Sequence, residues 1–99
     1  MPTRSNEQLC RLAQEGDTVA RDILLENNLG FIRKIALEQY RSMGLDENDI
    51  GIDLDDLMQE GSIGLLNAIP LFDVGRGMKF LTYSAPAIRN AMFPEGISG

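Results

Sequence analysis

The sequence contains no histidine, no tryptophan and a single cysteine, Cys10. Without histidine, a conventional zinc site or a Ser-His or Cys-His nucleophile pair cannot be built. A single cysteine also excludes an intrachain disulfide. The longest nearly apolar run, residues 65–72, is interrupted by Asn67 and Pro70 and is too short to cross a bilayer, and the first residues do not resemble a signal peptide. These absences exclude most hydrolase chemistry and predict a cytoplasmic protein. We expect no enzyme activity and no bound metal or cofactor.

Charge is unevenly distributed along the 99 residues. The net charge is −6, which taken alone argues against nucleic-acid binding. Residues 44–60, however, contain seven acidic residues and no basic one, whereas residues 74–94 contain Arg76, Lys79 and Arg89 and no acidic one. Two regions of opposite charge predict two different kinds of partner.

The hydrophobic spacing predicts an all-α fold, a compact bundle of about four to five helices in a single domain, 1–99. Ser5 and Gln8 fit a capping box that begins the first helix, and Asp17 caps the second. Further helices are expected over about 29–43, 53–72 and 80–92, with an acidic loop at 45–52, a turn at 73–77 and a tail at 94–99. Pro70 should fray the fourth helix, and Pro86 should bend the last one or force it to restart. The apolar residues of the second helix are Val19, Ala20, Ile23 and Leu24.

The fourth predicted helix has two informative faces. One is apolar and includes Gly61 and Gly64, where missing side chains would let another helix approach closely. The other surrounds Ile63 and Leu66 with polar residues, which is typical of a small protein–protein interface, although scattered exposed apolar residues on a solvated face give the same pattern. The first face comprises Leu54, Leu57, Met58, Gly61, Leu65, Ala68 and Phe72, and the second Asp56, Gln59, Glu60, Ile63, Leu66 and Asn67.

Three stretches of the chain resemble region 2 of the bacterial sigma-70 family. Residues 56–66 read DLMQEGSIGLL and resemble the family's D-L-I-Q-E-G-N-I-G-L segment. Residues 28–32 are similar to the N-L-R-L-V opening of the preceding helix, and residues 72–83 resemble the F-D-x-x-R-G-x-K-F-S-T-Y stretch. On this resemblance, residues 28–93 form a sigma region 2-like core, preceded by an N-terminal helical pair at 1–27.

The resemblance implies a transcription initiation factor that binds RNA polymerase core. In the family, the polar face of the fourth helix docks on the clamp helices of the β′ subunit. Carboxylates can pair with arginines of a basic coiled coil, and apolar side chains supply buried area. The positions that match are Asp56, Gln59, Glu60, Ser62, Ile63 and Leu66.

The resemblance also implies that residues 72–90 recognise and melt the promoter minus-ten element, with the non-template single strand as the ligand. Such a site needs basic side chains that bind phosphates and aromatic rings that stack on unpaired nucleobases. Tyr83 is the candidate for stacking on a flipped adenine, and Arg89 and Asn90 for reading the paired upstream end. An ordinary core role is the alternative for Phe80, Tyr83 and Ile88, and we expect Phe80 to be mainly core. The DNA-binding candidates are Arg76, Lys79, Thr82, Tyr83, Arg89 and Asn90.

Two departures from the family pattern affect this interpretation. Pro86 and Ala87 stand where housekeeping sigma factors have the two tryptophans that wedge the duplex open. The T-Y-S-A-P run resembles alternative sigma factors of the sporulation and stress type, and the missing wedge argues against unaided melting. The chain also stops before a basic continuation, as an excised domain, a truncated product or half of a split factor would.

Two other kinds of function also fit parts of the sequence: a protein-only interaction module and a metal-binding protein. A sigma-like module that binds polymerase without competent promoter recognition, as a decoy or a split-factor subunit, also fits the net charge and the missing wedge. An anti-sigma factor is a further candidate partner. Residues 55–60 superficially match an acid-rich magnesium motif, but a chain this short cannot enclose an isoprenoid cavity. A calcium loop from Asp46 fails because Ile50 and Leu57 stand where carboxylates are needed.

Overall fold

The structure, a computed structural model, describes residues 4–44 and 52–93, and every regular element in these ranges is helical. The predicted all-α fold is therefore confirmed. The acidic loop and the tail predicted at 45–51 and 94–99 lie outside the described residues. The elements are α1 (Asn6–Gln14), α2 (Thr18–Asn27), α3 (Leu29–Ser42), α5 (Leu54–Ala68), the 3-10 turns η1 (Ile69–Leu71) and η2 (Val74–Arg76), and α6 (Phe80–Ala91).

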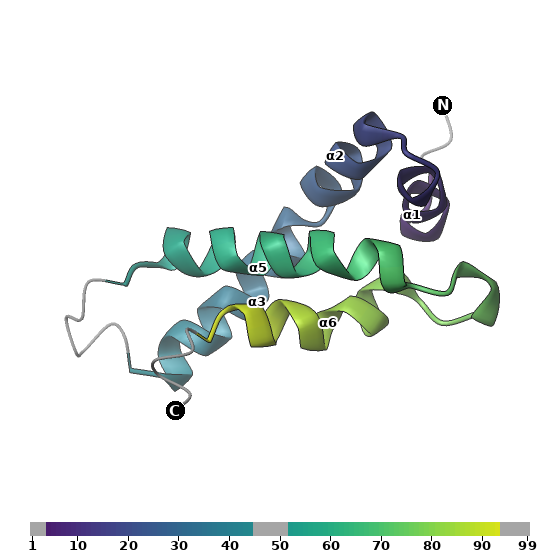
Figure 1. Ribbon diagram of the computed structural model, residues 1–99. Coiled ribbons are helices and arrows are strands. Elements are labelled where there is room, and N and C mark those ends of the chain that lie inside the picture. Colours follow the sequence, from purple (N-terminus) through teal and green to yellow (C-terminus); the bar gives the residue numbers. More distant parts are fainter. Residues whose placement is uncertain (1–3, 45–51, 94–99) are drawn as a thin grey trace.

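Helices α5 and α6 lie side by side and are joined at one end by the connection that contains η1 and η2 (Figure 1). Helix α3 packs across this pair, while α1 and α2 contact each other, with α1 reaching the connection. The helix pair and its connection thus form the centre of the fold. In the described ranges, no helix is long and apolar enough to cross a membrane.

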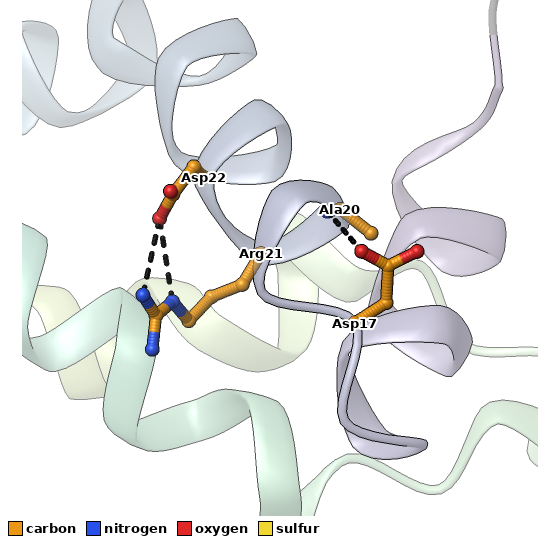
Figure 2. Close-up of polar contacts among 4 residues, drawn as sticks. All are labelled: Asp17, Ala20, Arg21 and Asp22. Atoms are coloured by element: carbon orange, nitrogen blue, oxygen red, sulfur yellow. Dashed lines mark hydrogen bonds and ion pairs between the residues drawn. The ribbon is translucent and has the colours of Figure 1, made fainter.

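The helix starts follow the predicted caps. Ser5 and Gln8 make both hydrogen bonds of a capping box on α1. Asp17 accepts a hydrogen bond from the backbone N–H of Ala20 at 3.0 Å and so caps α2, as Figure 2 shows beside the exposed Arg21–Asp22 ion pair. Each cap satisfies a backbone N–H that has no partner inside the helix. These starts were predictable because caps involve residues three positions apart.

The close approach predicted at two glycines holds α5 against α6. A Cβ at Gly64 would lie 2.6 Å from the carbonyl oxygen of Ala87, and one at Gly61 would collide with the Met92 side chain and meet Ile32 at 3.0 Å. Both glycines are buried, as are Leu57 and Leu65 on the same face. Gly64 therefore lets the two backbones pack at a distance that no larger residue allows, and Gly61 makes room for the side chains of Met92 and Ile32.

Only one side of the short helix α2 meets the core: Ala20 and Leu24 are buried, whereas Val19 and Ile23 are 65% and 39% exposed. Two sequence predictions need correction. The fourth helix ends at Ala68 and continues as the 3-10 turn η1 around Pro70, rather than as α-helix to 72. Of the two outcomes predicted at Pro86, a bend or a restart of the last helix, the restart does not occur.

Helix α6 runs continuously through Pro86 from Phe80 to Ala91. A proline at this position removes the hydrogen bond to the carbonyl of Thr82, four residues earlier. Both Pro86 and Thr82 are exposed, so water can solvate the carbonyl that loses its partner. The helix therefore tolerates the proline on its outer side.

Gly64→Ala should lower the free energy of unfolding by about 1–3 kcal/mol, the usual cost of overpacking, because the added methyl meets backbone that cannot rotate away. Gly30→Ala is the matched control, since nothing lies within 4 Å of a Cβ there. It should leave stability unchanged or slightly raised. Urea unfolding of both variants measures the difference, and equal midpoints would contradict the packing described above.

Cys10 gives a second prediction. Its side chain is fully buried, and burial, reinforced by the negative Glu7 carboxylate, raises the pKa of the thiol from 9.0 to about 11. The thiol ionises at lower pH in the unfolded chain than in the folded one. The buried thiol therefore contributes fully to the free energy of unfolding below pH 9, and this contribution is lost as the pH rises towards 11. Urea midpoints should fall more steeply over this range in the natural chain than in Cys10→Val. If the urea midpoints of the two proteins changed equally with pH, burial would not raise the pKa of the thiol.

Candidate functional site

The outward face of α5 begins at a well-capped helix start. Asp53 accepts a hydrogen bond from the backbone N–H of Asp56 at 2.9 Å, and the Asp56 carboxylate accepts one from the N–H of Asp53 at 2.9 Å. These acids also oppose the positive end of the helix dipole. Asp56, a predicted polymerase contact, is therefore held in a fixed place at the start of the face.

The structure brings the predicted contacts together on this face. Asp56, Gln59 and Glu60 are exposed, and Ile63 is 50% exposed beside them. Leu66 is half-buried, as is Ser62, whose hydroxyl donates to the carbonyl of Met58 at 2.8 Å. We call these six residues the α5 face. It combines carboxylates with a protruding branched apolar side chain, which suits a basic partner that also offers apolar surface.

The connection after α5 carries its own network. Asp73 accepts a hydrogen bond from the N–H of Gly75 and forms an exposed ion pair with Arg76 at 3.1 Å. Gly77 ends η2 with φ 77°, a conformation that side chains disfavour. This turn directs the chain into α6 and places Met78 at the surface, where it is 49% exposed.

Tyr83 lies at one side of the connection, in a pocket of about 360 Å³. Its ring packs against Phe72 with centroids 5.3 Å apart, and its hydroxyl donates to the carbonyl of Leu71 at 3.4 Å. We call this the Tyr83 pocket, and its lining residues are Leu71, Phe72, Asp73, Arg76, Met78 and Tyr83. It has apolar walls and one charged edge, an arrangement that fits a flat ring with polar substituents.

Phe80 stands apart from this pocket. It is fully buried and meets Phe72 edge-on with centroids 5.3 Å apart, so the prediction that it is mainly core is confirmed. Ile88 is also fully buried. Tyr83 itself is half-buried, so it packs against Phe72 and is also partly accessible at the surface.

Lys79 and Thr82 line a different and more open groove of about 700 Å³. Its opposite wall comes from the N-terminal helices and includes Arg4, Asn6, Glu7 and Asn28. The Glu7 carboxylate accepts a hydrogen bond from the backbone N–H of Phe80 at 2.7 Å, and so caps α6 from another helix. We call this the Lys79 groove. Sequence reasoning missed its N-terminal wall, because no local pattern links residue 7 to residue 80.

Arg89 and Asn90, the remaining predicted DNA contacts, are exposed at the far end of α6. Asn90 lines a groove of about 530 Å³ together with Asp56 and Glu60. The structure therefore divides the six predicted DNA contacts among three places, and one of these adjoins the acidic face. Within the described ranges, no group of three or more potential metal ligands is present.

Comparison with known proteins decides the family. The sequence model of sigma-70 region 2 matches residues 24–93. The chain belongs to the sigma-70 family. This match confirms the resemblance noted in the sequence. The sigma-70 family consists of transcription factors rather than enzymes.

Individual relatives agree with this assignment. The principal sigma factor HrdD of Streptomyces griseus is 38% identical over 88 residues, which cover 89% of this chain and 24% of that protein. A putative sigma-G factor of Bacillus thuringiensis subsp. kurstaki is 34% identical over 91 residues, or 89% of this chain and 66% of the relative. The sigma-F factor of Bacillus subtilis is 33% identical over 82 residues, or 83% and 29%. The chain thus spans between about a quarter and two thirds of these relatives.

Proposed function

We propose that this sigma region 2 domain binds the β′ clamp helices of RNA polymerase through the α5 face and holds an unstacked base of the minus-ten non-template strand in the Tyr83 pocket. The observation that carries the proposal is that pocket. Arg76 and Tyr83, both predicted from sequence to contact DNA, line one cavity with an aromatic and alkyl wall.

The chemistry of the Tyr83 pocket suits a nucleobase. A nucleobase presents a flat apolar face and a polar edge. Stacking of that face on an aromatic side chain favours binding of the nucleobase. Tyr83 supplies an accessible ring, which the buried Phe72 supports from behind. Leu71 and Met78 supply exposed apolar surface that a bound base would cover. Arg76, at the pocket edge, can exchange its exposed partner Asp73 for a phosphate, because such surface pairs contribute little.

The Lys79 groove provides a continuation for the strand. Lys79 and Thr82 lie on its α6 side, and Arg4 adds a second positive charge from the N-terminal segment. Its two basic residues outnumber the single carboxylate, Glu7, so the groove can track a phosphate backbone while bases are held in the aromatic pocket. Because Pro86 and Ala87 lack rings, the domain captures exposed bases but depends on the polymerase to open the duplex.

The α5 face supports the polymerase-binding half of the proposal. It contains Ile63, 50% exposed among carboxylates, which matches the centre of a small interface with a polar rim. This face and the Tyr83 pocket use different helices. Polymerase and DNA can therefore be bound at the same time.

A protein-only module remains the second candidate. It is favoured by Asn90, which shares its groove with Asp56 and Glu60, where negative charge opposes a phosphate. The two candidates differ in one outcome. The protein-only module binds the clamp helices and gives no sequence-dependent response to a minus-ten strand.

Tyr83→Ala should weaken binding of a fluorescent minus-ten non-template oligonucleotide by about 1–3 kcal/mol, roughly 5- to 150-fold, because a stacked base loses its ring. Anisotropy in the presence of a β′ clamp-helix fragment measures this. Tyr83→Phe is the matched control, since it keeps the ring and loses only the hydroxyl bond to Leu71, and it should lose much less affinity than Tyr83→Ala. If the natural chain binds a scrambled strand equally tightly, the promoter-binding half of the proposal fails.

Ile63→Ala should weaken clamp-helix binding by at least roughly tenfold, because a central apolar side chain is removed from the interface. Val19→Ala is the control, as Val19 is also branched, helical and 65% exposed, but lies on α2. It should bind like the natural chain. Calorimetric titration with the clamp fragment gives both affinities, and equal losses in the two variants would place the interface elsewhere.

A further inference from the structure

Helix α1 contacts the connection between α5 and α6 through backbone carbonyls. The Gln14 side-chain amide donates to the carbonyl of Ile69 at 2.9 Å and to that of Phe72 at 2.7 Å. The Cys10 thiol donates to the same Ile69 carbonyl, with 3.7 Å between sulfur and oxygen. The Ile69 carbonyl also accepts the backbone N–H of Phe72 at 3.3 Å, the bond that closes the 3-10 turn. Both amide hydrogens of Gln14 are used on this segment.

The segment that Gln14 holds is one wall of the Tyr83 pocket. Leu71 lies between the two bonded carbonyls, and its own carbonyl accepts the hydroxyl of Tyr83. Phe72, bonded directly, packs its ring on Tyr83 at 5.3 Å. Two hydrogen bonds from one side chain therefore fix the backbone on both sides of the residue that anchors Tyr83.

We propose that Gln14 is a positioning residue for base binding, which holds the 69–72 segment so that Leu71 and Phe72 keep Tyr83 at the pocket. This inference rests on the function proposed above. Gln14 lies outside residues 24–93, which match the family's sequence model, so the N-terminal helix contributes to a site built by region 2.

A purely structural role makes a different prediction. If α1 only adds stability, removing the Gln14 amide lowers the free energy of unfolding but leaves the pocket of the folded molecules unchanged. A positioning role changes the surroundings of Tyr83 and the affinity for the oligonucleotide in molecules that are fully folded. Binding to the clamp helices should be unaffected in either case, because the α5 face does not include this segment.

The test uses the full chain labelled with 3-fluorotyrosine, whose two tyrosines, Tyr40 and Tyr83, give two fluorine signals. Tyr40→Phe assigns them, and Tyr40 on α3 serves as the internal reference. Gln14→Leu removes both donors at nearly the same length. We expect its Tyr83 signal to shift or broaden while the Tyr40 signal stays, and its oligonucleotide affinity to fall roughly tenfold, the scale of one or two net hydrogen bonds.

Three further variants sharpen the result. Gln14→Lys keeps a donor towards the carbonyls and should restore most of the affinity, whereas Glu15→Gln, at the next position, should match the natural chain. Gln14→Asn keeps the amide one methylene shorter, and should move the Tyr83 signal in the same direction if Gln14→Leu does not fold. Folded Gln14 variants whose Tyr83 signal and affinity match the natural chain would overturn the inference.

The two proposals can fail separately. If the natural chain does not bind the minus-ten strand, the promoter function fails, and the Tyr83 fluorine signal still decides whether Gln14 positions the ring. If the natural chain binds, and Tyr83→Ala weakens binding while Gln14→Leu does not, only the positioning role is refuted.

Discussion

The close packing of α5 on α6 is the constraint on which the functional surfaces depend. At Gly64 the backbone of α6 comes so near that the carbonyl of Ala87 occupies the space of a side chain. Two helices packed this closely cannot rotate independently. One contact therefore fixes which residues of α5 point outwards, with Ile63 among them, and where α6 begins, with Tyr83 in its first turn. The α5 face and the Tyr83 pocket are therefore both positioned by the close contact at Gly64.

Packing between helices does not by itself shape the connection that joins them. Between Ala68 and Phe80 the chain has only short 3-10 turns, so its carbonyls and amides need partners from elsewhere. Helix α1 supplies them at both ends, through Gln14 at the end of α5 and Glu7 at the start of α6. The α1 helix thus substitutes for regular structure in the connection and determines the form of the pocket there.

Sequence reasoning reached the parts of this structure that depend on local spacing. Capping boxes join residues three apart, and the apolar face of α5 repeats with the helical period, so both were predictable. The pocket wall was not, because the exposure of Leu71 depends on the change from α-helix to 3-10 turn at Pro70. The role of Gln14 was beyond reach for another reason: its partners lie 55 and 58 positions away, and an exposed helical glutamine carries no local sign of a distant carbonyl.

The acidic and basic residues that are separated in the sequence are also separated in the structure. The acids of α5 are exposed, and Asp56 and Glu60 border the C-terminal end of α6, while Arg76 and Lys79 lie around the connection. A negative net charge is then compatible with DNA binding, because a phosphate responds mainly to charges within about 10 Å at moderate salt. Asn90 is the instructive exception, since it lies beside Asp56 and Glu60. At that end of α6 the acids would repel a phosphate unless a basic partner neutralised them. Clamp binding on the α5 face would do this, so polymerase binding should favour DNA binding along the whole of α6.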